Sequence, residues 1–480
     1  MASPTPTHYN AVIIGSGQGG TPLAQALAKA GRKTALIESS HIGGCCINEG
    51  CTPTKTLIAS GKVAYHMRRG ADYGINVSGG KDRKVVTDME RVRQRKRDIV
   101  ESWRAGGEKR TRDAGVEVLW GEGSFKSEKS MVVRLRDGQE KRITADSFFV
   151  NTGERPAKPK LPGIEDVPQD RKLDSTSVQE LGEVPSHLIV LGGGYIGLEF
   201  GQLFRRLGAE VTIIQRSSQL LPREDPDIAA SMLKILSEDG LTVHLSTNAS
   251  SVSWDEKHAS TGIHLQIRSN SGKEMEVVGS HLLSAAGRTP NTDMLNLSSA
   301  GVETNSKGYI EVNERLETSA PGIWAIGDVK GPPAFTHISY DDFRIVQANV
   351  LNPTRCYLST KNRTVPYVCF TDPQMAHVGF HEAEVRQKWP DRKIKVAKMP
   401  MNYVARALEM DESRGLMKVV VDAETSEILG FSCLGIEGGE IMSIVQMAMM
   451  GNVHYEVLKD AVWAHPSLAE SLNNLWGYLE

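Results

Sequence analysis

Near the N-terminus, an apolar run changes abruptly into glycines and then into a helical pattern. Tyr9 to Ile14, YNAVII, has the apolar, β-branched character of a short buried strand. It is followed by GSGQGG at 15–20 and by apolar residues at helical spacing to about Ala30. A further apolar run, KTALIE, ends at Glu38. The pattern predicts a strand, a glycine-rich turn, a helix and a second strand.

The same pattern recurs much later in the chain. Leu188 to Leu191, LIVL, leads into GGGYIG at 192–197, then into a predicted helix to about Leu207 and a strand, EVTIIQ. The two copies keep one register, because the glycine that ends each helix, Gly31 or Gly208, follows the first glycine of its loop by sixteen positions. Such agreement favours one repeated unit over two unrelated glycine turns.

In each copy a G-x-G-x-x-G sequence follows a strand and opens a helix, which is the context of a dinucleotide-binding fold. The glycines allow a tight turn and the close approach of a pyrophosphate, and the helix N-terminus supplies free N–H groups. We therefore expect two dinucleotide sites, with the glycines Gly15, Gly17 and Gly20 in the first and Gly192, Gly194 and Gly197 in the second.

The strand that follows the helix ends differently in the two copies. Glu38 ends the first, and its carboxylate can accept a hydrogen bond from a ribose hydroxyl. The second ends at Gln215, which is followed by Arg216. No carboxylate is left to repel a 2′-phosphate, and a guanidinium is present to bind one. The second site is therefore expected to bind NADPH rather than NADH; the alternative is that Arg216 is only a solvated strand-end residue.

Three of the six cysteines lie within Gly43 to Lys55, GGCCINEGCTPTK. Cys46 and Cys51 are separated by four residues, which is wider than the usual zinc-ligand pair, and the sequence offers no second ligand cluster, so no metal site is expected. A thiol pair at the start of a helix suits reversible disulfide formation, because the helix N-terminus stabilises a thiolate. The break at Pro53 predicts a helix from about Lys55 to Met67. The remaining cysteines are scattered: Cys356, Cys369 and Cys433.

The run from Gly43 to Lys55 resembles the redox-active loop of the flavin-dependent disulfide reductases, the family of dihydrolipoamide dehydrogenase, glutathione reductase and mercuric reductase. The resemblance extends along the whole chain, and the mercuric-reductase-like branch looks most similar. Further motifs that carry the resemblance are NTGERP at 151–156, AAGRTPN at 285–291, IWAIGDV at 323–329, VPYVCFTDPQMAHVG at 365–379 and WAHPSLAE at 463–470.

The resemblance implies a role for each residue around the thiols. Cys51 is expected to lie beside the flavin of FAD, and Cys46 is expected to exchange with substrate. Lys55 is expected near the flavin, paired with Glu199. Tyr195 is expected to be the aromatic residue that the nicotinamide displaces. Each of the last three residues taken alone would be unremarkable on a helix surface or at a helix entry.

The closing motif implies that His465 is the acid/base and Glu470 its orienting carboxylate, contributed by the other subunit of a homodimer. Pro466 favours an extended His465 and can start a helix, which would place Glu470 in the first turn. Without the thiols, His465 would be a helix-entry residue. The resemblance adds further FAD- and nucleotide-binding residues: Gly123, Thr152, Gly153, Asp328, Thr336, His337, Gly287 and Arg288, beside Glu38, Lys55, Gln215 and Arg216.

Two departures from the family pattern bear on the substrate. Cys45 replaces the usual Thr, and packing near the flavin is a simpler interpretation than a third reactive thiol. Gln18 and Gln25 stand where glutathione reductase has a Ser and an Arg, which argues against glutathione. The sequence thus predicts an NADPH-dependent flavoenzyme that reduces a disulfide or a soft metal ion. The alternatives are an NAD-dependent dihydrolipoamide dehydrogenase and a flavoprotein redox sensor with little turnover.

Six cysteines are too few for a disulfide scaffold of this size, so we expect a cytoplasmic protein. The 480 residues suggest about three domains. We expect an α/β protein: a split FAD domain at 1–151 and 284–346, an NAD(P)H domain at 152–283, both Rossmann-like, and an α+β dimerisation domain at 347–480. The net charge of −2 gives no reason to expect a nucleic-acid or membrane partner. Alternating stretches such as GLMKVVVD and ILGFSCLG predict antiparallel strands in the third domain.

Overall fold

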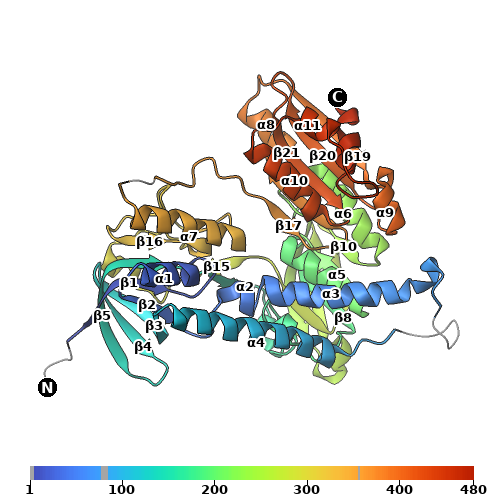
Figure 1. The fold of residues 1–480 in the computed structure, drawn as a ribbon. Coiled ribbons are helices and arrows are strands. Elements are labelled where there is room, and N and C mark those ends of the chain that lie inside the picture. The colour runs from blue at the N-terminus through green and yellow to red at the C-terminus, as the bar shows by residue number, and fades with distance from the viewer. Residues whose placement is uncertain (1–4, 77–84, 355–356) are drawn as a thin grey trace. The chain divides into compact units, whose positions relative to one another are not determined.

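The computed structural model describes residues 5–76, 85–354 and 357–480 (Figure 1). The chain forms two compact units. The first contains residues 1–56, 93–157 and 287–363, and the second contains residues 57–92, 158–286 and 364–480. This division into two units does not separate the three domains expected from the sequence, so those domains and their boundaries stay a prediction.

The first unit is built on a sheet whose parallel strands lie in the order β3-β2-β1-β5-β16, with β4 paired antiparallel to β3 and β5. Alternate residues of β1 enter two different cores: Val12 and Ile14 lie in one, and Ala11 and Ile13 in the other. The sheet is therefore covered on both faces, which explains its nearly continuous apolar strands. Figure 1 shows α1 beside α7, and the two helices are in contact.

The elements of the first unit, with the helix α3 that continues into the second, are β1 Thr7–Ile14, α1 Gly20–Lys29, β2 Thr34–Glu38, α2 Gly44–Asn48, α3 Cys51–Arg68, α4 Met89–Asp113, β3 Glu117–Ser127, β4 Ser130–Leu135, β5 Glu140–Val150, β6 Glu154–Pro156, β15 Arg288–Pro290, β16 Ile323–Ala325 and α7 Thr336–Leu351. The repeat predicted from the sequence is confirmed here, since α1 follows β1 and leads into β2 as expected. Strand β1 begins at Thr7, two residues before the predicted start at Tyr9.

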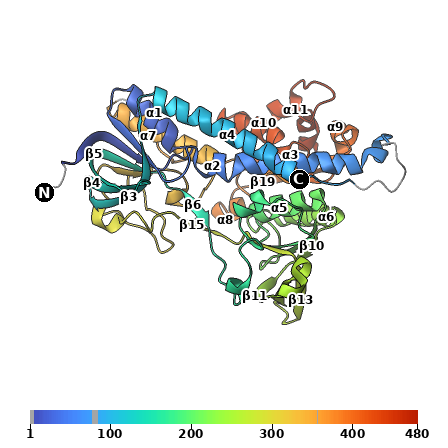
Figure 2. The same cartoon turned by 90° about the horizontal axis from the view of Figure 1, so that it is seen from below.

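The second unit contains a fully parallel sheet in the order β10-β9-β8-β14-β7. The predicted second repeat forms its centre, with α5 between β8 and β9. A three-stranded antiparallel sheet, β11-β12-β13, accompanies it (Figure 2). The bounds are β7 Lys172–Leu173, β8 His187–Leu191, α5 Tyr195–Leu207, β9 Glu210–Ile214, α6 Pro226–Glu238, β10 Thr242–His244, β11 Thr247–Trp254, β12 Ile263–Ser269, β13 Glu274–Gly279 and β14 His281–Ser284.

A five-stranded antiparallel sheet, β17-β18-β21-β20-β19, completes the second unit. Its strands β20 and β21 coincide with the two alternating stretches singled out in the sequence, so that prediction is confirmed. Helix α10 packs on β18 and β21. The bounds are β17 Tyr367–Cys369, β18 Gln374–Gly379, α8 Glu382–Lys388, β19 Ile394–Pro400, α9 Ala405–Glu409, β20 Leu416–Asp422, β21 Ile428–Gly435, α10 Gly438–Met450, α11 Tyr455–Asp460 and α12 Ser471–Asn474.

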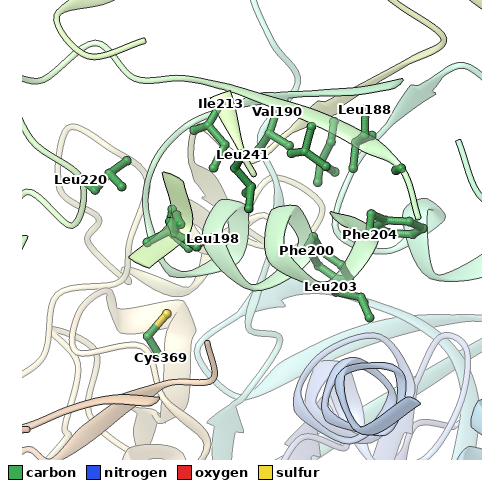
Figure 3. Close-up of a cluster of buried hydrophobic side chains, with 14 of the residues drawn as sticks. Leu188, Val190, Leu198, Phe200, Leu203, Phe204, Ile213, Leu220, Leu241 and Cys369 are labelled. Carbon is green, nitrogen blue, oxygen red and sulfur yellow. The ribbon is translucent and has the colours of Figure 1, made fainter. Parts of the chain in front are cut away.

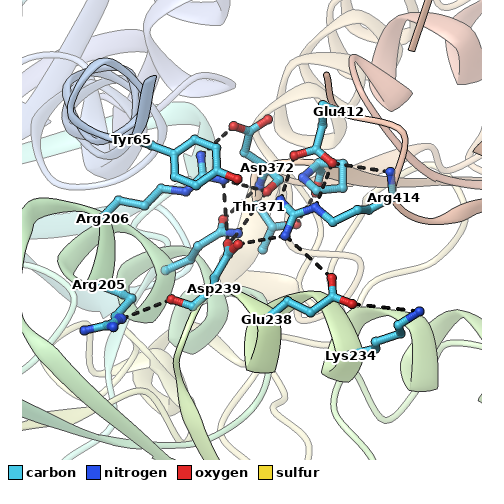
Figure 4. Close-up of polar contacts among 12 residues, drawn as sticks. Tyr65, Arg205, Arg206, Lys234, Glu238, Asp239, Thr371, Asp372, Glu412 and Arg414 are labelled. Carbon is cyan, nitrogen blue, oxygen red and sulfur yellow. Dashed lines mark hydrogen bonds and ion pairs between the residues drawn. The ribbon is translucent and has the colours of Figure 1, made fainter. Parts of the chain in front are cut away.

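Helix α5 is held from two sides. Its apolar face packs into the core cluster of Figure 3, where Leu198 and Phe204 meet side chains of β8 and β9. Near its C-terminal end, buried Arg206 lies 2.5 Å from an Asp372 carboxylate oxygen and 4.0 Å from the centre of the Tyr65 ring (Figure 4). Asp372 lies between β17 and β18, so this buried ion pair fixes the start of the antiparallel sheet against α5.

Two helix boundaries differ from the sequence predictions. Helix α3 begins at Cys51 rather than near Lys55, and Pro53 lies in its first turn. Proline is tolerated there because the N–H groups of a first turn have no acceptor within the helix. The helix expected to start at Pro466 begins only at Ser471. Among the described residues, no helix combines the length and the apolar character needed to span a bilayer.

Candidate active site

The two cysteines of the redox loop come together on two helices that follow each other in the chain. Cys46 lies on α2 and Cys51 is the first residue of α3. A hydrogen bond to Cys51, burial and the charge of Cys51 together raise the pKa of Cys46. The two thiols therefore influence each other's ionisation, as expected for groups in direct contact. A disulfide between them would close a loop of four intervening residues.

Two helix N-termini meet at this thiol pair. Cys51 opens α3, and its Sγ lies 3.3 Å from the Oγ1 of Thr336, the first residue of α7. A helix N-terminus carries a partial positive charge that stabilises a thiolate. Thr336 was expected among the cofactor-binding residues; the structure places its hydroxyl against Cys51. Lys55 follows Cys51 by one helical turn and so lies on the same face of α3.

The redox loop packs directly on the glycine loop of the first repeat. A Cβ on Gly44 would lie 2.5 Å from the Cα of Gly17. The Gly43 N–H donates to the Ser16 hydroxyl at 3.1 Å, and the Gln18 side chain donates to the Gly43 carbonyl at 3.2 Å. Any dinucleotide held by this glycine loop would therefore lie next to the element that carries the thiols.

The first glycine loop has the geometry required for a bound dinucleotide. Gly15 has φ +95°, and a Cβ there would lie 2.3 Å from the Asn151 carbonyl oxygen, so only glycine fits. The Glu38 carboxylate accepts from the Ser16 N–H at 3.1 Å and from the Ser40 N–H at 2.7 Å. The Asn151 side chain accepts from the Gly20 N–H at 2.6 Å. This leaves the turn fixed and the N-terminus of α1 presented for the pyrophosphate of FAD.

The second glycine loop repeats this arrangement with different chemistry. Gly192 has φ +114°, and a Cβ there would lie 2.6 Å from the Ala285 carbonyl oxygen. The Gly193 N–H donates to Gln215 Oε1 at 3.1 Å. A Cβ on Gly194 would meet no atom within 4 Å, which leaves open space in front of the N-terminus of α5. Arg216 is exposed at the end of β9. These features fit the pyrophosphate and the 2′-phosphate of NADPH.

Tyr195, the expected aromatic gate, opens α5 and is tied to a buried carboxylate. Its hydroxyl donates to Glu224 Oε1 at 3.1 Å, and its ring lies 5.6 Å from that of Tyr367. Glu199, one turn further along α5, is buried and accepts from the Phe370 N–H at 2.8 Å. The expected pairing of Glu199 with Lys55 stays a prediction.

His465 and Glu470 are in contact, as the closing motif predicts. The imidazole Nδ1 lies 2.9 Å and 3.2 Å from the two carboxylate oxygens. Glu470 holds this position from the residue before α12 rather than from a helical turn started by Pro466, which corrects the expected local structure. The imidazole is 74% exposed and its carboxylate partner 17%. An exposed ring with one nitrogen fixed leaves Nε2 open to a substrate or a partner subunit.

Two predicted cofactor residues of the first unit, Arg288 and Asp328, belong to a buried cluster of charged groups. Arg288 Nε lies 2.5 Å from Glu154 Oε1, and an Arg288 Nη2 lies 3.9 Å from Cys45 Sγ. Burial and the charge of Glu154 raise the pKa of Asp328 to about 6. Burial raises the pKa of Cys45 to about 11, although Arg288 opposes this, so Cys45 is a neutral thiol at pH 7.

Other predicted residues occupy turns or structural contacts in the same unit. Thr152 Oγ1 donates to the Asn291 carbonyl at 2.8 Å, Gly153 has φ +66° and Gly287 has φ +155°. Gly123 lies on β3, and the His337 ring stacks on that of Phe335 with centres 5.4 Å apart. Gln25, one of the two glutamines that argue against glutathione, donates to Thr111 Oγ1 of α4 at 3.1 Å.

Sequence reasoning missed several residues of these sites. Asn151 belongs to the NTGERP motif, but its contacts with the first glycine loop were not predicted. The available sequence signal is an asparagine directly after β5, together with Gly15 and Gly20. Glu154 was missed as the partner of Arg288. Glu224 was missed because its contacts to Tyr195 depend on the loop between β9 and α6, which has no sequence signature.

Comparison with known proteins gives one family for the whole chain. The profile described as "Pyridine nucleotide-disulphide oxidoreductase" matches residues 9–343, and the profile of the dimerisation domain of that family matches residues 365–475. A probable pyridine nucleotide-disulfide oxidoreductase, RclA of Escherichia coli, is 37% identical over 98% of this chain and 99% of its own. A dihydrolipoyl dehydrogenase of Thermus scotoductus is 34% identical over 97% of this chain and 96% of its own.

One further relative and a solved structure complete the comparison. A mercuric reductase of Staphylococcus aureus is 34% identical over 97% of this chain and 81% of its own. A solved structure described as the Cu(II) complex of the HOCl-induced flavoprotein disulfide reductase RclA from Escherichia coli superposes with a TM-score of 0.87, at 36% identity and with 98% of this chain and 99% of that chain covered. With its repeated dinucleotide loops and its paired thiols, the chain belongs to the pyridine nucleotide-disulphide oxidoreductases and is a flavin-dependent enzyme of that family.

Proposed function

We propose that this enzyme takes electrons from NADPH, passes them through FAD to the Cys46–Cys51 disulfide, and uses the resulting thiols to reduce a disulfide or a soft metal ion. The observation that carries the proposal is the thiol pair itself, which lies at the N-termini of α3 and α7 and on the first glycine loop. FAD, when bound, supplies the two-electron step between the nucleotide and the disulfide.

Residues of both units would hold the two cofactors. The loop around Gly15, with Glu38 and Asp328, would hold FAD. The loop around Gly192 would hold the pyrophosphate of NADPH, and Arg216 its 2′-phosphate. Gln215 supports this choice, because its amide already bonds the Gly193 N–H without the negative charge that would repel a phosphate.

The thiols would act in a fixed order. Two electrons and two protons convert the disulfide into the thiols of Cys46 and Cys51. Cys46, as thiolate, attacks a substrate disulfide, forms a mixed disulfide and releases one substrate thiol. Cys51 then attacks the Cys46 sulfur, which releases the second substrate thiol and restores the internal disulfide. A soft metal ion would instead be bound by the thiolates and reduced by their electrons.

His465 would move the protons of this cycle. Its Nδ1 is held by Glu470, which leaves Nε2 to take the Cys46 proton and to return it to the departing substrate thiolate. The raised pKa of Cys46 makes such a base necessary, because the thiol would not ionise readily by itself. The relatives support both substrate classes, since they include a mercuric reductase and a disulfide reductase solved with Cu(II).

We further propose a cytoplasmic homodimer in which His465 and Glu470 serve the thiols of the other subunit. The dimerisation domain and the exposed imidazole support this arrangement. Large apolar side chains near the C-terminus are exposed in the single chain, including Val462, Met447 and Met450. Burial of such side chains between subunits would remove an otherwise unfavourable surface.

The thiol role is tested by Cys46→Ser, with Cys45→Thr as the matched control because Thr is the usual family residue at that position. Each enzyme is reduced anaerobically with NADPH and then mixed with disulfides, Hg(II) or Cu(II). We expect Cys46→Ser to retain FAD reduction and to lose turnover by at least about 1,000-fold, as removal of a covalent nucleophile does elsewhere. Wild-type turnover in Cys46→Ser would refute the proposal.

The shared site is tested with hybrid dimers of Cys46→Ser and His465→Gln subunits. Neither homodimer has a complete site, whereas each hybrid dimer has one complete site if thiols and imidazole come from different subunits. Random mixing should then restore about a quarter of the wild-type activity. If both groups served their own subunit, every site in the mixture would lack one of them and no activity would return.

A further inference from the structure

A second cluster of potential ligands lies in the second unit. Glu224 follows β9, His377 lies on β18 and His381 precedes α8. All three residues are buried, with exposed fractions of 4%, 2% and 7%, and one ligand atom from each lies within 4.8 Å of the other two. The spacing of the two histidines in HVGFH is their only sequence signal, and nothing in the sequence links them to Glu224.

Glu224 has one satisfied oxygen and one unsatisfied oxygen. Its Oε1 accepts from the Tyr367 hydroxyl at 2.8 Å and from the Tyr195 hydroxyl at 3.1 Å. Its Oε2 is fully buried and makes no hydrogen bond within the described part of the chain. That oxygen lies 4.0 Å from His381 Nε2. A buried carboxylate oxygen without a donor is unfavourable unless a cation satisfies it.

The two imidazoles are stacked face to face, with centres 3.8 Å apart and planes inclined by 16°. His377 contacts the Gly379 carbonyl through Nε2 at 3.1 Å and the Ser432 hydroxyl through Nδ1 at 2.8 Å. The carbonyl can only accept a hydrogen bond, so the N–H of His377 is on Nε2 and the lone pair is on Nδ1. Nδ1 could bind a metal ion in place of the Ser432 hydroxyl.

We propose that Glu224, His377 and His381 bind one divalent first-row transition ion, such as Zn²⁺. Two imidazole nitrogens and one carboxylate oxygen form a donor set that Zn²⁺ accepts, with a fourth position left for water or for the Ser432 hydroxyl. This site is separate from the redox thiols and carries no sulfur ligand.

Metal binding would require a modest local rearrangement. Tetrahedral bonds of about 2.0–2.2 Å separate ligand atoms by about 3.4 Å, so the three atoms must move closer than they are here. The rings must also turn out of their parallel stack, because each metal–nitrogen bond lies in the plane of its imidazole. Rotation of the His381 ring would exchange its contact with Tyr367 for the ion, while the carboxylate keeps both tyrosine hydroxyls on Oε1.

The test measures Zn²⁺ directly in the FAD-loaded enzyme with its redox disulfide oxidised, so that Cys46 and Cys51 cannot bind the ion. Metal-stripped protein is dialysed against Zn²⁺ with a competing chelator, and bound zinc is quantified. The variants are Glu224→Gln and the double variant His377→Gln/His381→Gln. The control is His264→Gln, which removes a histidine from another His–Glu pair, with Nδ1 3.3 Å from Glu276 Oε2.

We expect one Zn²⁺ per subunit in the wild type and in the control. Both test variants should bind it at least about 100-fold more weakly, since loss of a ligand exceeds the 10- to 100-fold cost of losing an outer-shell partner. Retained FAD and an unchanged far-ultraviolet spectrum would show that the variants are folded. X-ray absorption of the Zn²⁺-loaded wild type should show two imidazole ligands. Equal affinity in all proteins, absence of bound zinc from the wild type, or sulfur ligation would overturn the proposal.

Discussion

The two glycine loops use the same backbone and differ in one charge. In the first, a Glu38 oxygen accepts the N–H of Ser16 at 3.1 Å; in the second, Gln215 Oε1 accepts the N–H of Gly193, also at 3.1 Å. The residue that ends the second strand therefore supports the turn in both cases. The first of these residues carries a negative charge and the second does not, so two similar turns present different electrostatics to a bound nucleotide.

The two repeats also continue differently. After β2 the chain enters the redox loop, which packs back on its own glycine loop. After β9 it enters the segment that carries Glu224, whose carboxylate holds the Tyr195 hydroxyl at the N-terminus of α5. One repeat thus leads into the paired thiols, and the other restrains an aromatic ring at the N-terminus of its own helix.

The largest contrast should come from placing a methyl group on the first glycine of each loop. Gly15→Ala and Gly192→Ala both combine a positive φ with a Cβ at 2.3 Å or 2.6 Å from a carbonyl oxygen. We expect Gly15→Ala to purify without FAD. Gly192→Ala should stay yellow but should not be reduced by NADPH. Absorbance of the purified proteins and anaerobic titration check both outcomes, and FAD retention in Gly15→Ala would contradict the proposed assignment of the first site.

The role of positive charge at the second site is tested by Arg216→Ala. Removal of the guanidinium should raise the KM for NADPH by about 10- to 100-fold, the value of one or two charge-assisted hydrogen bonds, and should leave the KM for NADH nearly unchanged. Arg216→Lys should fall between, because it keeps the charge and loses the planar fork. An equal rise in KM for NADPH and for NADH would mean that Arg216 does not bind the 2′-phosphate.

A smaller effect concerns the buried acid of the first site. Burial raises the pKa of Asp328 to about 6 in the folded protein, above its unfolded value, so its contribution to folding is present below pH 4 and is lost as the pH rises to 6. The FAD-free protein should therefore lose about 2 kcal/mol of unfolding free energy over this interval, and Asp328→Asn should lose none. Denaturant titrations at several pH values measure the difference; parallel curves for the two proteins would exclude this source of pH dependence.

The smallest effect is expected from making the first site resemble the second. Both Glu38 oxygens accept from N–H groups, so the amide of Glu38→Gln must turn its NH₂ group toward either Ser16 or Ser40. Loss of one such bond should weaken FAD binding by about 10-fold, near 1.4 kcal/mol. Fluorescence titration of the FAD-free protein would report it. Unchanged FAD affinity would show that an amide can support this turn as well as a carboxylate does.

The sequence was most informative where a residue type has a strict local geometry. Gly15 and Gly192 have positive φ in the same register, as their repeat predicts, and His465 meets Glu470 because only five positions separate them. Prolines were less reliable: Pro53 was taken to precede a helix and instead lies inside its first turn. Contacts such as those of Glu224 with His377 and His381 could not be predicted, because they depend on packing between a loop of the parallel sheet and a distant antiparallel strand.

The hydrogen bond between Tyr195 and Glu224 stabilises the docked position of the tyrosine ring at the N-terminus of α5. A hydrogen bond to a charged acceptor contributes about 1.5–3 kcal/mol, so an undocked Tyr195 ring is populated roughly 10- to 100-fold less than it would be without that acceptor. If Tyr195 has its predicted role, nicotinamide entry would then be slowed by the Glu224 carboxylate. Protonation of Glu224, or its binding to a metal ion, would then change the rate at which the nucleotide delivers electrons and would leave the thiol chemistry unchanged.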